Sequence, residues 1–312
     1  MPFRERLIHY SLGRLLKKTA KKPPIECEKV VIFSDHHKGI RNGADDFEQC
    51  ESSYNDALDY FYKEGYTLII LGDAEELWEE SVSSVIKSNE KILKKEALFF
   101  NQNRYYRIYG NHDYDWKSHK LVKQYLWDYF PKLKVHESLL ITVSDRNYFL
   151  FHGHQGELLN DYLRGLSKVI VKWVWRTFQL ITKKSISHLS KHIDEVKWHD
   201  DVLYKWSSKQ KDIISIAGHT HRPIWLSHTH KEQKEGKVTK KECYFNTGCC
   251  CCSDGDITGI TITSQRMQLI KYAKNSDTIE EERVPIVLAE KAFNSDHPLD
   301  STKKKPISMT VN

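Results

Sequence analysis

The stretch VVIFSDHHKGIRNG, residues 30–43, passes from an apolar strand into a polar loop. Its first four residues are β-branched or aromatic, as in a strand buried inside a sheet. Side chains on an extended chain alternate between two faces, so Asp35 and His37 are expected to share one face and His36 the other. A carboxylate and an imidazole held together at a strand end can bind a metal ion. Taken alone, the Asp-X-His pattern is a weak signal, and an ordinary polar strand end is the favoured interpretation.

Length and composition indicate a globular protein. The chain has 312 residues, 39% hydrophobic and 12% aromatic, which suits one large domain or two small ones. The net charge of +6 is too small an excess to require a nucleic-acid partner. The N-terminal stretch lacks the apolar run and cleavage site of a signal peptide, so the cytoplasm is the expected location.

The order of apolar and amphipathic segments predicts an α/β domain over residues 25–275. A basic amphipathic helix at 4–18, within segment 1–24, is expected before it. Strands and helices then alternate to residue 153, and later strands follow one another with little helix between, which predicts an antiparallel second half. Helices are expected near 46–63, 80–101 and 116–129, and strands near 29–35, 66–73, 104–110, 138–144, 147–153, 213–218, 223–228, 242–247, 257–264 and 267–273.

Residues 157–210 interrupt this order and predict a helical insert or cap. In LSKVIVKWVWRTFQLI, residues 166–181, Lys168, Lys172 and Arg176 recur every four residues among apolar side chains that include Trp173 and Trp175. The segment is too short and too charged to span a bilayer. Three alternatives are open: it lies at a membrane interface, lines a lipid pocket, or packs as a core helix.

Two further segments have simpler interpretations. Four consecutive cysteines, Cys249 to Cys252, cannot all point at one ion, because zinc sites space their cysteines by two to four residues. Small buried thiols on a loop between late strands are the favoured interpretation, and a redox role stays open. Residues 276–312 are polar and charged, which predicts a mobile tail, although VPIVLAEKAF within them could dock.

Five apolar runs each end in side chains that bind metals, and strand ends in an α/β sheet meet at one edge. Imidazole, carboxylate and one amide, without thiolate, suit Mn, Fe, Zn or Ni. There are too many donors for one open site, but two ions about 3.5–4 Å apart that share a carboxylate would use them all. The five groups are Asp35 and His37; Asp73 and Glu76; Asn111, His112 and Asp113; His152 and His154; and His219 and His221.

The five groups form a series of motifs along residues 29–273: Asp-X-His, Gly-Asp-X-X-Glu, Gly-Asn-His-Asp, His-Gly and Gly-His-Thr-His. This series, in this order, resembles the calcineurin-like metallophosphoesterases. The resemblance implies a four-layer α-β-β-α sandwich of two mixed sheets with a dinuclear centre at one edge. It also implies two divalent ions, Mn first among them. The activity implied is hydrolysis of a phosphomonoester, phosphodiester or pyrophosphate by a metal-bound hydroxide.

The resemblance assigns roles residue by residue. His112 is the non-ligand histidine that protonates the leaving oxygen or stabilises phosphoryl charge, and Asp113 orients it. Arg222 is expected to contact a phosphate, and His154 has no assigned role. The first metal takes Asp35, His37, Asp73 and His221, and the second takes Asp73, Asn111, His152 and His219, with Asp73 as the bridge.

Within this family, LGDAEELW (residues 71–78), GHTHRP (residues 218–223) and the helical insert resemble the UDP-2,3-diacylglucosamine diphosphatases. That closer resemblance implies a lipid-linked or UDP-sugar-lipid substrate and peripheral attachment to a membrane. The sequences DHHKG and HGH depart from the pattern, so another pyrophosphate, a phosphodiester or a phosphoprotein are alternatives. A nuclease of this fold is a further alternative, although no dedicated nucleic-acid-binding module is visible. A non-catalytic scaffold would require missing ligands.

Overall fold

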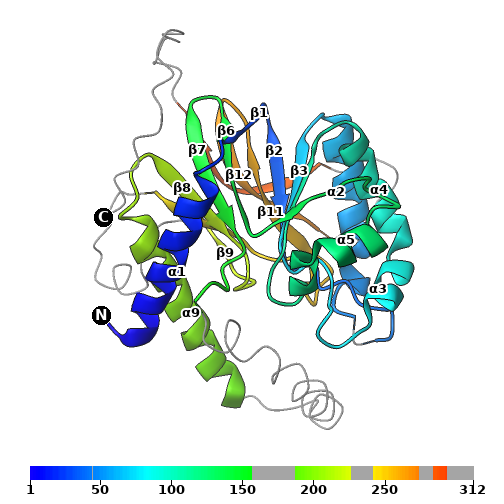
Figure 1. The fold of residues 1–312 in the computed structure, drawn as a ribbon, viewed down its shortest axis with the longest axis horizontal. Helices are drawn as coiled ribbons and strands as arrows, with labels where there is room; N and C mark the ends of the chain where they lie inside the picture. The colour runs from blue at the N-terminus through cyan, green and yellow to red at the C-terminus, as the bar shows by residue number, and fades with distance from the viewer. Residues whose placement is uncertain (44, 157–186, 226–241, 274–283, 294–312) are drawn as a thin grey trace.

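The computed structural model describes residues 1–43, 45–156, 187–225, 242–273 and 284–293, and its strands form two mixed sheets packed face to face (Figure 1). The seven-stranded sheet comprises, in spatial order, β13 (Ile286–Ala292), β12 (Arg266–Tyr272), β11 (Ile257–Ile262), β2 (Val30–Phe33), β3 (Thr67–Leu71), β4 (Tyr105–Ile108) and β5 (Val135–His136). The six-stranded sheet comprises β1 (Ile25–Cys27), β6 (Ser138–Val143), β7 (Arg146–Phe151), β8 (Ile213–Ala217), β10 (Tyr244–Thr247) and β9 (Pro223–Ile224).

Strands β2, β3, β4 and β5 run parallel, whereas β11 is antiparallel to both β2 and β12. The predicted antiparallel second half is therefore correct for β11 and β12. For β10 it is correct on one side only: β10 runs antiparallel to the edge strand β9 but parallel to β8.

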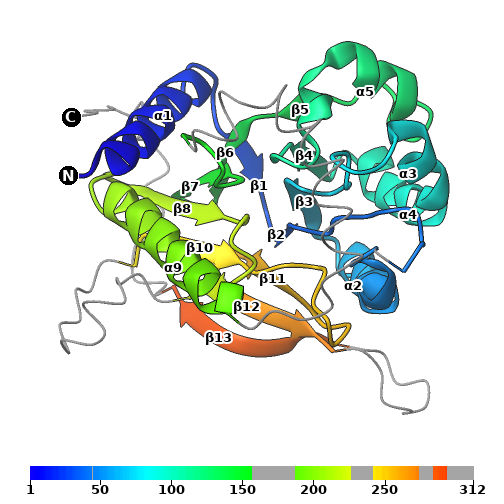
Figure 2. The same cartoon turned by 90° about the horizontal axis from the view of Figure 1, so that it is seen from below.

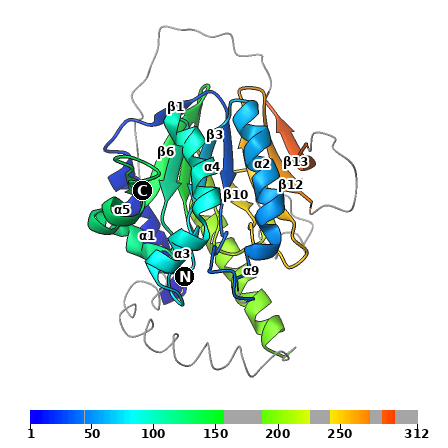
Figure 3. The same cartoon turned by 90° about the vertical axis from the view of Figure 1, so that its right-hand side faces the viewer.

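Helices cover the outer face of each sheet, which completes the four predicted layers (Figures 2 and 3). On the six-stranded sheet lie α1 (Phe3–Thr19) and α9 (Ser187–Ser207). On the other sheet lie α2 (Glu51–Lys63), which follows η1 (Glu48–Cys50), α3 (Val82–Ser88), α4 (Glu90–Asn101) and α5 (His119–Tyr125), which follows η2 (Tyr114–Lys117).

Strand β2 is buried on both faces, which is why its sequence is uniformly apolar. Val31 and Phe33 pack in the cluster beneath α2 and α4. Val30 and Ile32 point the other way, into the cluster between the sheets. A third cluster joins the six-stranded sheet to α1 and α9.

The N-terminal helix is a layer of the fold. Ile8, Leu12, Leu15 and Leu16 are buried against the six-stranded sheet, so this apolar face is not available to a membrane. Among the residues that the structure describes, no helix is long and apolar enough to cross a bilayer.

Two predicted boundaries change. The helix expected at 80–101 breaks at Asn89, whose side-chain amide donates to the carbonyl oxygens of Val85 (2.8 Å) and Gly39 (2.9 Å) and so ties the helix junction to the loop after β2.

The tail expected from residue 276 contains β13, which pairs with β12 as an edge strand of the seven-stranded sheet. Most of the predicted insert, including Trp173 and Trp175, lies outside the described residues.

Candidate metal centre

The five motifs meet where β2, β3, β4, β7 and β8 end, at one edge of the sandwich. Backbone hydrogen bonds join their loops: the amide of Asp35 donates to Gly72 O (3.1 Å) and that of His37 to Asp73 O (3.0 Å). The amide of His112 donates to Asp73 Oδ1 at 2.8 Å. The amide of His219, which follows β8 of the six-stranded sheet, donates to Asp35 Oδ2 at 3.0 Å, so residues from both sheets surround one small volume.

Five of the seven predicted ligands have a left-handed backbone. This conformation is uncommon for residues other than glycine and is concentrated at functional sites, where the surrounding structure holds it in place. It places the side chains in the centre instead of along a continuing strand. The φ values are 53° at Asp35, 50° at His37, 49° at Asp73, 71° at His219 and 55° at His221.

Glycines make room for the two carboxylates. A Cβ on Gly218 would lie 2.5 Å from Asp35 Oδ2, and a Cβ on Gly110 would collide with Asp73 Oδ1. Any side chain at either position would displace a predicted ligand.

The donors predicted for the first metal converge. His37 Nε2 lies 3.1 Å from His221 Nε2. His221 Nε2 lies 3.4 Å from Asp35 Oδ1, and His37 Nε2 lies 3.8 Å from Asp73 Oδ2. These separations suit four donors facing one cation from different sides.

The donors predicted for the second metal lie next to the first group. Asp73, His152 and His219 each offer an atom within 4.8 Å of the others. His152 Nε2 lies 3.0 Å from Asp73 Oδ2, the same oxygen that faces His37. Asn111 is buried, and its Oδ1 has no hydrogen-bond partner among the described residues. An unpaired buried oxygen of this kind fits a ligand atom.

Three of the four predicted imidazole ligands are held through their other nitrogen, as is usual for metal-binding histidines. The His37 Nδ1–H faces Glu76 Oε2 at 3.1 Å, and the His152 Nδ1–H donates to Leu71 O at 2.9 Å. His221 Nδ1 lies 3.6 Å from the sulfur of Cys251. In each case Nε2 points into the centre.

Electrostatics favour ionised carboxylates. Burial disfavours the charged form of Asp73, but nearby His152 and His112 outweigh it and hold its pKa well below the usual range. The pKa of Asp35 is lowered in the same way, against burial, by His152 and His221. Two buried carboxylates surrounded by imidazole nitrogen and amide oxygen are a donor set that fits divalent cations.

His112 is held by a residue that the sequence left without a role. Its Nδ1 lies 2.6 Å from Glu76 Oε2, and a carboxylate can only accept, so Nδ1 carries the proton. Burial lowers the pKa of His112, but Glu76 and Asp73 raise it to about 9. The Trp78 ring stacks on His112 at 4.3 Å, and Trp78 Nε1 donates to Asn111 O at 2.6 Å. The spacing of Glu76, three residues after Asp73, was the available signal.

Asp113 accepts hydrogen bonds from backbone amides, not from the ring of His112. Its Oδ1 accepts from the amide of Gly110 (2.6 Å) and its Oδ2 from the amide of Ala74 (2.9 Å). The carboxylate therefore pins the loops after β3 and β4 together beneath the centre. Arg107 Nη2 lies 3.8 Å from Asp113 Oδ2, whereas the hydrogen bond that orients His112 comes from Glu76.

Other predicted residues take different places. Arg222 Nη1 lies 3.5 Å from Asp200 Oδ2 on α9, which directs the guanidinium toward that helix. The His154 ring lies 5.5 Å from that of His152, beside the second donor group.

His36 is fully buried, with its ring centroid 4.6 Å from that of Tyr54, and burial holds the pKa of His36 well below the ordinary value. It faces away as predicted, although the cause is the left-handed backbone of Asp35 and His37 and not strand alternation.

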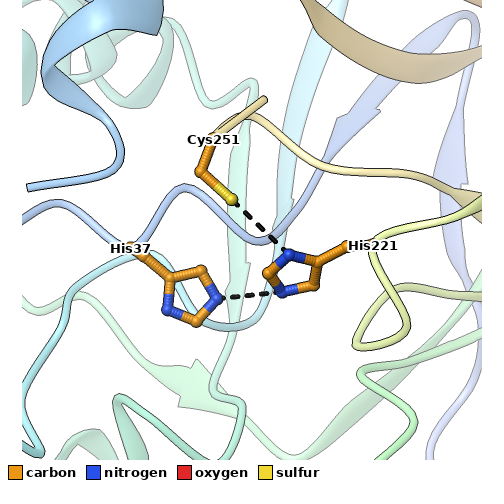
Figure 4. Close-up of side chains that lie close together, drawn as sticks. All are labelled: His37, His221 and Cys251. Atoms are coloured by element: carbon orange, nitrogen blue, oxygen red, sulfur yellow. Dashed lines mark hydrogen bonds between the residues drawn. The ribbon is translucent and has the colours of Figure 1, made fainter. Parts of the chain in front are cut away.

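Cys251 is a near-site residue that sequence reasoning missed. Figure 4 shows its sulfur beside His221, on the side opposite His37. Cys249 and Cys250 are buried, as expected for small structural thiols, whereas Cys251 and Cys252 are partly exposed.

A cavity of about 480 Å³ opens onto the donor groups. Val196 of α9 borders it. Its described wall combines His37, Asp73, His112, His219 and His221 with the acidic residues Asp45, Asp46, Glu76, Glu79 and Glu80.

Residues 28–223 match the calcineurin-like phosphoesterase family. No curated protein matches the chain. Among solved structures it is similar to the phosphoesterase YfcE from E. coli (14% identity, 85% of this chain and 100% of that chain, TM-score 0.40). It is also similar to an archaeal phosphodiesterase (19%, 76% and 93%, TM-score 0.34) and to vacuolar protein sorting 29 from Cryptosporidium parvum (13%, 86% and 98%, TM-score 0.36).

The family match extends over well over half of the chain. The chain therefore belongs to the calcineurin-like phosphoesterase family and is a hydrolase that acts on phosphoester bonds.

Proposed function

We propose that this hydrolase works with two divalent cations bridged by Asp73. The observation that supports this most directly is that Asp73 Oδ2 lies 3.8 Å from His37 Nε2 and 3.0 Å from His152 Nε2, so one oxygen serves both donor groups. When bound, such cations polarise a phosphoryl oxygen and activate water. Mn²⁺ is the first ion to test, because carboxylate, amide and imidazole donors suit it.

The residues of this chain supply orientation and a proton. Glu76 and Trp78 fix the His112 ring, with Nδ1–H toward Glu76. His112 Nε2 is then the atom that protonates the leaving oxygen or stabilises negative charge on the phosphoryl group.

The substrate we propose is a phosphomonoester, phosphodiester or pyrophosphate. A lipid-linked or UDP-sugar-lipid compound is the first candidate. Support comes from the apolar stretch at 166–181 with its basic stripe. As part of the same proposal, the protein acts in the cytoplasm, at the surface of a membrane.

The alternative of a nuclease is less well supported. Asp45, Asp46, Glu79 and Glu80 line the described part of the cavity, and carboxylates repel a polyanionic strand. A phosphoprotein or nucleotide substrate remains the second candidate.

The test is a substrate panel with the Mn²⁺-loaded protein: p-nitrophenyl phosphate, bis-p-nitrophenyl phosphate, UDP-diacylglucosamine, cyclic nucleotides, a phosphopeptide and single-stranded DNA. Metal analysis should approach two ions per chain, and Asp73→Asn should abolish turnover and lose both ions. Asp59→Asn, at an exposed position of α2, is the control. Full activity with one ion per chain would contradict the shared carboxylate.

A further inference from the structure

The loop between β10 and β11 contacts two residues assigned to the first metal. The amide of Cys250 donates to the carbonyl oxygen of Asp35 at 3.1 Å. The next residue, Cys251, places its sulfur 3.6 Å from His221 Nδ1. A change in this short loop is therefore transmitted to both Asp35 and His221.

The residues that flank this pair are themselves close together. Cys249 Sγ lies 3.2 Å from Cys252 Sγ, and both are free thiols. A disulfide has an S–S length of about 2.05 Å, so an approach of about 1 Å closes the bond. Cys249 is buried and Cys252 is partly exposed, so Cys252 is the sulfur that a reagent in solution reaches first.

We propose that Cys249 and Cys252 are a dithiol–disulfide site, oxidised by a small disulfide such as oxidised glutathione. The Cys252 thiolate attacks one sulfur of glutathione disulfide, breaks that bond and releases one glutathione. The Cys249 thiolate then attacks Cys252 Sγ, which forms the internal disulfide and releases the second glutathione. Two protein thiols are oxidised, one glutathione disulfide is reduced, and the two thiol protons end on the two glutathiones.

Oxidation weakens the first metal position. The disulfide closes a ring that contains Cys250 and Cys251, and drawing the sulfurs together shifts the contacts to Asp35 and His221. This consequence rests on the proposed function, in which those residues bind a metal. Linkage makes the effect reciprocal: a cation that prefers the dithiol form makes the dithiol harder to oxidise.

The hydrogen bond with Cys249, together with burial, raises the pKa of the Cys252 thiol. Thiolate is therefore scarce near neutral pH and exchange is slow. The equilibrium fraction of disulfide is the quantity to measure.

The full-length protein would be equilibrated in glutathione buffers of graded ratio, with and without Mn²⁺, then quenched in acid, alkylated and mapped by peptide mass spectrometry. We expect a Cys249–Cys252 disulfide in oxidising buffer and a midpoint that moves to more oxidising ratios with Mn²⁺. Oxidised protein should bind Mn²⁺ more weakly by about 10–100-fold, the usual effect of disturbing groups that orient ligands.

Cys252→Ser should remove both the disulfide and the redox dependence of Mn²⁺ affinity, whereas Cys27→Ser, on β1, should change neither. Bonds between other cysteines, or no disulfide at any ratio, would overturn the proposal. Equal Mn²⁺ affinity of both redox forms would overturn the link to the metal. If reduced wild-type protein bound no Mn²⁺ while the disulfide still formed, the proposed function would fail and the thiol site would stand.

Discussion

His112 and Glu76 form the hydrogen-bonded pair at the centre, with Nδ1 and Oε2 2.6 Å apart. The same carboxylate oxygen lies 3.1 Å from His37 Nδ1, so Glu76 orients both a candidate ligand and the histidine proposed to act on the leaving group. Burial raises the pKa of Glu76, but His112 outweighs it, and the resulting pKa of about 2 keeps the carboxylate ionised.

Glu76→Gln should lower kcat by about 10–100-fold, the range for residues that orient catalytic groups. At saturating metal, the Glu76→Gln/His112→Ala double variant should be about as slow as His112→Ala alone, because Glu76 acts through His112. Steady-state kinetics of the four proteins measure this. Multiplicative losses would show that Glu76 contributes independently of His112.

Alanine variants of the adjacent residues His36 and His37 should differ in metal content. His37→Ala removes a donor and should empty or loosen the first metal position. His36→Ala should keep both metals but lower stability by about 2–4 kcal/mol, because it leaves a cavity against Tyr54 and Phe47. Metal analysis and urea denaturation distinguish the two. Loss of metal in His36→Ala equal to that in His37→Ala would contradict the geometry.

His112→Ala should keep both metals while the rate falls about 10²–10⁴-fold, the usual range for a lost general acid or base. Metal analysis together with turnover on p-nitrophenyl phosphate measures this. A variant that lost metal in proportion to activity would make His112 a ligand and not a proton donor.

Asp113→Asn should act on stability. Replacing one oxygen with an amide NH₂ sets a donor against a backbone N–H, which costs about 1–3 kcal/mol. Urea denaturation should show this loss, while Asp128→Asn, an exposed control, should not. A large rate loss with unchanged stability would restore the orienting role that the sequence suggested.

Asp200 should make stability depend on pH. Burial raises its pKa to about 7, even though Tyr244, Arg222 and Thr220 favour the charged form. Because the unfolded value is about 3.9, the folded state binds this proton more tightly, and its contribution to stability is lost as pH rises from about 4 through about 7. Asp200→Asn should flatten that slope in denaturation curves, and Asp194→Asn on the same helix should keep it. A slope unchanged in Asp200→Asn would show that Asp200 stays ionised.

The sequence by itself determined the strands that end in metal-binding groups, the four-layer class of the fold and the family. Apolar runs such as β2 end abruptly at polar residues, and strand ends in an α/β sheet meet at one edge. The spacing of the motifs along the chain therefore predicts which side chains gather at that edge. Among the described residues, four that this logic singled out, Asp35, His37, His152 and His219, offer donor atoms close to Asp73.

Only the tertiary structure decided which polar group each side chain meets. Asp113 is adjacent to His112 in sequence, yet Glu76 binds that ring, because the left-handed backbone at Asp73 turns the loop after β3 beneath it. Cys251 lies thirty residues from His221 and reaches it through the pairing of β10 with β8. Sequence patterns describe spacing along one chain, whereas these contacts depend on how loops from two sheets pack against each other.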